Sequence, residues 1–337
     1  MAIYKLGEIC SFQRGQQDKN FSLLKTIEKP YPIISAGKNI KGYYQDWNRQ
    51  KGIPSISSSG ANAGFITIPN ENYFAADCFS VYSKDEQKIK QKYLNLILLK
   101  TQNLIFNFQR GSGQPHVYPK DISEIRSYIP LLKEQQKIID IIEPLEILST
   151  KIEATKKMII SLLKMIANNK VEKTNELLIN HLTFEKGKNG PKEFESSGTP
   201  FLDVRTLNTR IPSKFVKDQP NTFKGDILLS LDATVGLVDW FIEGFNGYLY
   251  NLKSDHLTKV EILLNVLNDN NKKIIEMNAT GSTIKHASKA KKEMLYFKLH
   301  HEWKNITNTL FKLLLLVEEI GAKKTKLYQL CVNLLIR

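Results

Sequence analysis

Residues 134–170 read EQQKIIDIIEPLEILSTKIEATKKMIISLLKMIANNK, and this stretch predicts one long helix. Large aliphatic side chains recur at alternating steps of three and four residues, which is the a/d spacing of a coiled-coil seam. Pro144 lacks a backbone donor, so we expect a kink or a restart of the helix near it. The predicted seam residues are Ile138, Ile141, Leu145, Leu148, Ile152, Thr155, Ile159, Leu162 and Ile166.

The same pattern returns 168 residues later, which is the distance from Ile138 to Ile306. Identities such as Glu134 with Glu302 fall on the same offset. The chain therefore carries a duplicated unit, a globular part followed by a long helix. The second predicted seam comprises Ile306, Thr309, Leu313, Leu316, Ile320, Lys323, Leu327, Leu330 and Leu334.

A Gly-Ser motif precedes each of the two predicted helices. GSGQPHVYP occupies residues 111–119 and GSTIKHASK occupies residues 281–289, and in both a His follows the Gly by five residues. Weaker echoes pair SFQRG at 11–15 with TFEKG at 183–187, and SSSGANAGFI at 57–66 with LSLDATVGLV at 229–238. Short runs of β-type residues between Gly, Asn and Asp turns predict compact α+β domains around these motifs.

Two helices with one narrow apolar stripe each must bury those stripes. An antiparallel pair buries both at once, whereas the alternative is that each helix packs on its own globular domain. We therefore expect an α+β fold with two pseudo-symmetric globular domains joined by two long helices that form an antiparallel coiled coil. The expected boundaries are 1–133 for the first domain, 134–176 for the first helix, 177–300 for the second domain and 301–337 for the second helix.

Length and composition are those of a soluble protein with two domains, since 337 residues include 42% hydrophobic ones. The first residues, MAIYKLGEIC, lack the apolar run of a signal peptide, and LFKLLLLV at 310–317 is too short to span a bilayer. Cys10, Cys78 and Cys331 are isolated, which argues against a zinc site or a disulfide framework. We expect a cytoplasmic protein.

The net charge of +14 points to a polyanionic partner. Only seven of the 48 basic residues are Arg, so a bias of the genome toward Lys codons is an alternative explanation for the total charge. Local clustering favours nucleic acid, because residues 272–298 hold seven Lys around the second Gly-Ser motif.

The residue types in the motifs suit contacts with DNA. FQRG occurs at 12–15 and again at 108–111, which places an Arg beside a flexible Gly in both stretches. Arg side chains contact guanine edges and Gln side chains contact adenine edges, and both also bind phosphate. The alternative is that Gly-Ser is ordinary turn chemistry and that the His side chains cap or pack. The candidate DNA-binding residues are Arg14, Gln16, Arg110, Gln114, His116, Lys285, His286 and Lys289.

In their order, these motifs resemble the specificity (S) subunit of type I restriction–modification systems over essentially the whole chain. KLGEI at 5–9 is similar to the opening of a target-recognition domain in that family. GSGQPHVYPKDISEIRSYIPLLKEQQKI at 111–138 resembles the end of such a domain, with a Glu-Gln pair that opens the helix. GDILLSLDATVGLV at 225–238 is similar to the hallmark strand and turn of the second domain.

The resemblance implies a DNA-binding specificity subunit that performs no catalysis. Each target-recognition domain would bind one half of a bipartite target in double-stranded DNA, and the paired helices would set the gap. The chain would dock two methylation subunits and, in full complexes, two restriction subunits that translocate and cleave DNA. No cofactor is expected on the chain itself, because S-adenosylmethionine would be carried by the methylation subunits. No membrane partner is expected.

Motifs of catalysis are absent from the sequence. It contains no G-x-x-x-x-G-K-[ST], no G-x-G-x-x-G and no Asn/Asp-Pro-Pro-aromatic motif of an amino-methyltransferase. No H-x-x-x-H pair is present for a metal either. These absences favour a binding module over an enzyme. A non-DNA scaffold or adhesion-like protein, with two globular heads on a coiled-coil stalk, is the alternative function.

Overall fold

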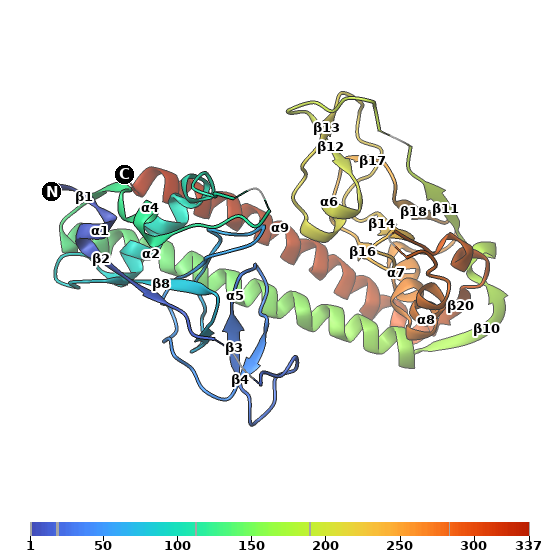
Figure 1. The fold of residues 1–337 in the computed structure, drawn as a ribbon. Coiled ribbons are helices and arrows are strands. Elements are labelled where there is room, and N and C mark those ends of the chain that lie inside the picture. Colours follow the sequence, from blue (N-terminus) through green and yellow to red (C-terminus); the bar gives the residue numbers. More distant parts are fainter. Residues whose placement is uncertain (1, 18–19, 112, 189, 283, 337) are drawn as a thin grey trace. The chain divides into compact units, whose positions relative to one another are not determined.

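The computed structural model describes residues 2–17, 20–111, 113–188, 190–282 and 284–336. It divides into two compact units (Figure 1), of which unit 1 is Met1–Leu148 with Lys324–Arg337 and unit 2 is Ser149–Lys323. The two long helices, α5 (Leu132–Asn169) and α9 (Lys304–Leu335), each contribute one segment to both units.

Unit 1 is built from a four-stranded antiparallel sheet, a three-stranded sheet and a strand pair. Its strands are β1 (Ala2–Lys5), β2 (Cys10–Arg14), β3 (Tyr31–Ile34), β4 (Gly42–Tyr44), β5 (Ser55–Ser57), β6 (Ile66–Thr67), β7 (Phe74–Ala75), β8 (Cys78–Ser83) and β9 (Arg126–Ile129). Its short helices are α1 (Leu6–Ile9), α2 (Gln91–Lys100), α3 (Gln102–Phe106) and α4 (Pro119–Ser123). The strand orders are β2-β8-β5-β6, β4-β3-β7 and β1-β9, and only β3 and β7 run parallel.

Unit 2 contains the same three sheets. Its strands are β10 (Val171–Leu177), β11 (Thr183–Lys186), β12 (Thr199–Leu202), β13 (Phe215–Val216), β14 (Ile227–Leu229), β15 (Asp232–Ala233), β16 (Val238–Asp239), β17 (Phe245–Asn246), β18 (Tyr250–Lys253), β19 (Lys285–His286) and β20 (Leu295–Leu299). Its helices are α6 (Val204–Thr209), α7 (Lys259–Leu267) and α8 (Asp269–Met277), with short 3-10 turns η1 (Leu178–Asn180), η2 (Ser288–Lys292) and η3 (His301–Trp303).

The strand plan is duplicated, which agrees with the duplication in the sequence. The sheets of unit 2 have the orders β11-β18-β14-β16, β13-β12-β17 and β10-β20, and they match the sheets of unit 1 strand for strand. The parallel pair recurs as β12 with β17. Unit 2 adds the pair β15-β19, whereas unit 1 has only an isolated bridge between Ser59 and His116 at the corresponding place. An α+β fold with two globular units and two long helices is therefore confirmed.

The Glu-Gln pair at the start of α5 has a structural role. Gln135 is fully buried, and its side-chain amide donates to the carbonyl oxygens of Lys88 and Pro130, both at 2.9 Å. Its Oε1 accepts from the backbone N–H of Lys90, also at 2.9 Å. One side chain thus satisfies three backbone groups, and it anchors the first turn of α5 to the segment before α2.

The two long helices contact each other inside each unit, and in unit 2 they run antiparallel. In unit 2 Lys156 Nζ lies 2.9 Å from Glu318 Oε1, and Gly321 approaches Ile152 so closely that an added Cβ would lie 3.4 Å from its Cγ2. In unit 1 the Tyr328 hydroxyl donates to Glu146 Oε1 at 3.2 Å. Within unit 2 the contact positions rise from 318 to 321 on α9 as they fall from 156 to 152 on α5, so the helices are antiparallel there.

The predicted seam of α9 is wrong by one residue. All nine predicted positions are exposed, among them Leu313, Leu316 and Leu334. The buried or half-buried positions each lie one residue later, at Thr307, Leu310, Leu314, Val317, Gly321, Lys324, Tyr328, Cys331 and Leu335. The physical reason is that the contact stripe contains small or polar residues, whereas the largest aliphatic side chains face outward.

The predicted seam of α5 is correct at six of its nine positions. Ile138, Leu145, Ile152, Thr155, Ile159 and Ile166 are buried or half-buried. Ile141, Leu148 and Leu162 are exposed, and their inward counterparts are Ile142, Ser149 and Leu163. Both long helices also enter the core of each unit, for example through Leu163 and Leu314 in unit 2. The alternative of packing on the globular part therefore holds alongside the helix pairing.

Three of the expected boundaries need correction, the first because α5 begins at Leu132 rather than at residue 134. The first helix was expected to extend to residue 176, but α5 ends at Asn169 and residues 171–177 form β10, which pairs with β20. The second helix begins at Lys304, after η3, rather than at residue 301. α5 continues through Pro144 without a restart.

The register of the α9 seam can be tested with two neighbouring leucines. Leu314 is fully buried whereas Leu313 is 44% exposed. We expect Leu314→Ala to lower the free energy of unfolding by about 2–5 kcal/mol because it leaves a cavity in the core of unit 2. Leu313→Ala should cost well under half as much. Urea and thermal unfolding of both variants measure the difference, and a larger loss for Leu313→Ala would restore the register that the periodicity predicted.

Candidate nucleic-acid interface

The two Gly-Ser motifs form the same turn. In unit 1 the backbones of Arg110 and His116 exchange hydrogen bonds of 3.0 and 2.8 Å, and in unit 2 those of Thr280 and His286 do so with the same lengths. Gly111 and Gly281 have φ angles of +108° and +109°, a conformation that other residues rarely adopt. Ser112 and Thr283, which also belong to these motifs, lie outside the described residues.

Each turn lies against the loop that follows the third strand of the four-stranded sheet. In unit 1 Val117 N–H donates to the carbonyl oxygen of Ser58 at 3.1 Å, and in unit 2 Ala287 N–H donates to that of Leu231 at 2.7 Å. The motif SSSGANAGFI therefore meets GSGQPHVYP, and LSLDATVGLV meets GSTIKHASK. The echoes found separately in the sequence belong to one repeated site.

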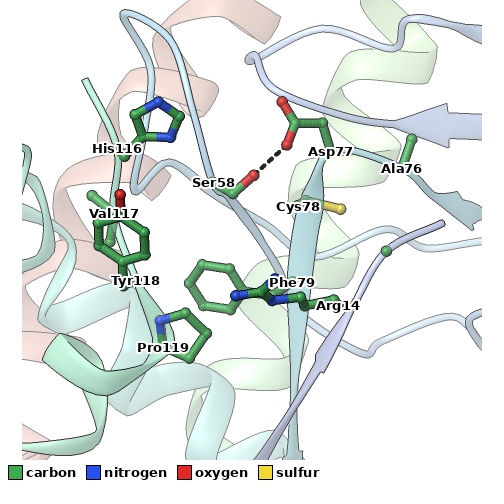
Figure 2. A pocket seen from close by; sticks show the side chains of 11 residues that line it. Arg14, Ser58, Ala76, Asp77, Cys78, Phe79, His116, Val117, Tyr118 and Pro119 are labelled. Atoms are coloured by element: carbon green, nitrogen blue, oxygen red, sulfur yellow. Dashed lines mark hydrogen bonds between the residues drawn. The ribbon is translucent and has the colours of Figure 1, made fainter. Parts of the chain in front are cut away.

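The site of unit 1 is a pocket of about 250 Å³ (Figure 2). Arg14 at the end of β2, His116 on the turn and Asp77 just before β8 line this pocket. The His116 ring stacks on Tyr118, with centroids 6.1 Å apart and planes 20° from parallel. Of the candidate residues in unit 1, the structure thus brings Arg14 and His116 together.

The other candidates of unit 1 point elsewhere. Arg110 forms an ion pair of 2.6 Å with Asp121. The Gln16 side chain accepts a hydrogen bond from Asn48 Nδ2 at 3.3 Å. Gln114 is exposed at the tip of the turn. These three residues do not line the pocket, so their contacts with DNA stay predictions.

The site of unit 2 is organised around a carboxylate. Asp232 on β15 accepts from His286 Nδ1 at 2.9 Å and from Lys186 Nζ at 3.2 Å. Burial alone would raise the pKa of Asp232, but the hydrogen bonds from His286 and Lys186 lower it below its usual value. The candidates Lys285 and Lys289 are exposed beside this cluster, on β19 and η2.

The sequence alone missed several residues of these sites. Lys186 ends β11 as Arg14 ends β2, and the echo of SFQRG in TFEKG already aligned the two. Asp232 and Ser58 lie in the second pair of echoes, so the repeat itself carried their signal. Asp77 lies in neither echo, and nothing in the pattern singled it out.

Arg49 supports the site of unit 1 from beneath, although no motif includes it. Its side chain is only 2% exposed and forms no ion pair within the part of the chain that the structure describes. Nη2 donates to the carbonyl oxygen of Arg14 at 2.7 Å, Nη1 to that of Asn48 at 2.7 Å, and Nε to Ser80 Oγ at 2.9 Å. A buried guanidinium thus holds the end of β2, and with it the backbone of Arg14.

Neither a metal centre nor a membrane span is found in the structure. Among the residues described, no group of three or more His, Cys, Asp or Glu could hold a metal ion. No helix within the described ranges has the length and apolar character needed to cross a membrane. The sites offer hydrogen-bond donors, acceptors and aromatic faces, which are the groups that contact nucleic acid.

Replacing Arg49 tests its role in positioning Arg14. Arg49→Met removes the donor from the buried Ser80 hydroxyl and from two backbone carbonyl groups, so we expect the unfolding free energy to fall by about 1–3 kcal/mol. Binding of DNA through unit 1 should weaken as well, because the end of β2 is released. Arg126→Met, at an exposed residue of β9, is the matched control and should change neither quantity. Wild-type stability and DNA affinity in Arg49→Met would contradict the assignment.

Comparison with known proteins extends these findings. A family model described as "Type I restriction modification DNA specificity domain" matches residues 1–161. No curated protein matches the chain. A crystal structure of the S subunit of a type I restriction–modification system from M. genitalium has 15% sequence identity and a TM-score of 0.61, and the match covers 100% of this chain and 96% of that one. The HsdS subunit from Thermoanaerobacter tengcongensis, also 15% identical over 100% and 96% of the two chains, gives a TM-score of 0.34.

The family model and the M. genitalium structure agree with the resemblance found in the sequence. The likeness to the M. genitalium subunit establishes the fold over the whole chain, and the family model identifies its first part as a DNA specificity domain. Residues 1–161 thus match a type I restriction–modification DNA specificity domain, and the whole chain shares the fold of a solved S subunit.

Proposed function

We propose that this chain is the specificity subunit of a type I restriction–modification system, and that each of its units reads one half of a split target in double-stranded DNA. The observation that carries the proposal is the repeated site, in which one turn and one His recur with different neighbours. In unit 1 the turn lies with Arg14 and Asp77, and in unit 2 with Lys186 and Asp232. Different donors and acceptors on the same frame suit two different half-sites.

Affinity and selectivity have different sources in this proposal. The exposed Lys side chains near the second turn, including Lys285 and Lys289, would contact phosphates and make binding sensitive to salt. Arg14, and the groups around His286, would contact base edges. Each good base contact discriminates by about 1–3 kcal/mol.

The two half-sites can be separated by mutation. We expect Arg14→Ala to weaken recognition of one half-site and His286→Ala to weaken recognition of the other, because the two residues belong to different units. Mapping of methylated adenines, with each variant co-expressed with its methylation partner, gives the target of each. Arg126→Ala should leave both halves intact. If both variants altered the same half-site, one unit would suffice for recognition and the proposal would fail.

We further propose that the pairing of α5 with α9 sets the gap between the half-sites. The pairs Lys156 with Glu318, and Glu146 with Tyr328, fix the register of this pairing at separate points. A helix rises ~1.5 Å per residue, so the number of residues between such points determines a length.

Matched insertions test this role of the helices. Glu153 and Ala154 face Ile320 and Gly321, judging from the neighbouring contact of Ile152 with Gly321. Inserting seven residues between each of these two pairs adds one heptad to both helices and about 10 Å of length. We expect the gap to lengthen by at most about three base pairs, at ~3.4 Å each, with both half-sites unchanged. Methylome mapping measures the gap and both half-sites. An unchanged gap with altered half-sites would show that the helix pair does not set the gap.

The partners are proposed from the family together with the exposed surface of the helices. Two methylation subunits, which carry S-adenosylmethionine, and two restriction subunits complete the assembly in this proposal. Each unit exposes a set of large apolar side chains on its helix segments, a surface that favours protein partners. These are Ile141, Ile147, Leu148, Leu327, Leu330 and Leu334 in unit 1, and Met158, Leu162, Met165, Ile306, Leu313, Leu316 and Ile320 in unit 2. One such set per unit supports one methylation subunit per unit.

A further inference from the structure

Asp77 is an exposed carboxylate that two serine hydroxyl groups hold in one orientation in the pocket of unit 1. We propose that Asp77 is a specificity-determining residue of unit 1, and that its carboxylate accepts a hydrogen bond from the exocyclic amino group of a cytosine or an adenine in the major groove. This inference rests on the proposed function of unit 1 as the reader of one half-site, and it assigns one residue to one class of base.

The carboxylate is held in place by two neighbouring hydroxyl groups. Ser58 Oγ donates to Asp77 Oδ1 at 2.5 Å (Figure 2), and Ser59 Oγ donates to Asp77 Oδ2. Ser57 Oγ donates in turn to the carbonyl oxygen of Ser59 at 3.2 Å. The hydroxyl groups of Ser57, Ser58 and Ser59 therefore all donate their protons to hydrogen bonds within the protein.

Only acceptors remain for a ligand on this side of the pocket. A hydroxyl group has one proton, so Ser58, which lines the pocket, can offer a ligand only oxygen lone pairs once it has donated to Asp77. An ionised carboxylate likewise only accepts. The pocket thus presents a fixed set of acceptors beside Arg14, which presents only donors.

The charge of Asp77 is not compensated as that of Asp232 is. Asp77 is exposed, and it forms no ion pair with any residue in the described part of the chain. Asp232 in unit 2 is paired with Lys186 and His286 instead. An uncompensated carboxylate is repelled by phosphates, so a DNA-facing site retains it at a cost unless a donor on the DNA faces it.

The bases that supply such a donor form a small class. In the major groove cytosine presents the N4 amino group and adenine presents the N6 amino group, whereas guanine presents N7 and O6 and thymine presents O4, all acceptors. The Asp77 carboxylate attracts the first two bases and repels the other two. Arg14 in the same pocket suits guanine, so a G·C pair would satisfy both sides at once.

A structural role for Asp77 is the competing explanation, since it also fastens the serine turn. That role predicts lost stability with no change in base preference, because a turn that loosens affects contacts to all bases of the half-site. A reading role predicts a change at a single base pair. The experiment below therefore measures base preference at every position rather than affinity alone.

The test uses the specificity subunit in complex with its methylation partner. Equilibrium binding is measured on duplexes in which each base pair of the half-site read by unit 1 is replaced in turn. For the wild type we expect about 5–150-fold preference for cytosine or adenine at one position, and the panel identifies which base it is. Asp77→Ala should reduce this preference below about threefold, with the other positions and the second half-site unchanged. Asp77→Asn, which can still accept from a serine, should alter the same single position if the Ala variant fails to fold.

Glu28→Ala is the matched control, because it removes an exposed carboxylate from the same unit. It should leave the preference at every position unchanged. A rise in affinity for all duplexes in Asp77→Ala, with the preference retained, would show that Asp77 only repels phosphates and would overturn the inference. If the wild-type complex showed no preference within this half-site, the proposed function of unit 1 would fail, and the role of Asp77 with it.

Discussion

The architecture of unit 2 depends on the ion pairs that the buried carboxylate of Glu318 forms. Glu318 lies on α9 with 9% exposure, and it forms ion pairs with Lys156 of α5 at 2.9 Å and with Arg210 at 2.6 Å. Arg210 follows α6 and also pairs with Asp239 of β16 at 2.6 Å. Burial alone would lower the pKa of Arg210, but Asp239 and Glu318 raise it. An isolated buried charge is costly, so these four charged side chains must stay paired. Their ion pairs fix both long helices to the four-stranded sheet of unit 2 in one arrangement.

Glu318 also illustrates which parts of the fold a hydrophobic sequence pattern can predict and which it cannot. Periodicity revealed the two helices, their duplication and their antiparallel pairing, because these follow from apolar stripes of the right length. It misplaced the seam of α9, because the contact stripe uses Thr307, Glu318 and Gly321, which a hydrophobic pattern passes over. Thr307 satisfies its hydroxyl on the helix backbone, Glu318 is paired, and Gly321 permits close approach. Polar or small residues can be buried once their partners are known, and those partners are not visible in one sequence.

In the candidate sites, too, the sequence pattern indicated some features, whereas others are visible only from contacts in the folded chain. The Gly-Ser motif correctly indicated two equivalent turns, because the left-handed backbone at Gly111 and Gly281 demands glycine in both. The fold brings Arg14 and His116 into one pocket, which the sequence did not indicate, and their contacts with DNA stay predictions. Arg110 was chosen by the same FQRG pattern, yet it pairs with Asp121. Arg49 lies in no repeat, and only the folded chain shows that it supports Arg14.

The two sites differ most in how their carboxylates are balanced, and this difference bears on what each unit can read. Because the pKa of Asp232 is lowered below its ordinary value of 3.8, its ion pair with Lys186 is formed above that pH and is lost only as the pH falls through the lowered value. At neutral pH the charge of Asp232 is therefore already committed within the protein. The lone pairs of Asp77 are shared only with neutral hydroxyl groups, so its full charge remains available to a ligand. The same duplicated fold thus presents a charge-paired carboxylate, Asp232, in unit 2 and an acceptor carboxylate, Asp77, in unit 1. Such a difference allows two copies of one domain to recognise two unlike sequences.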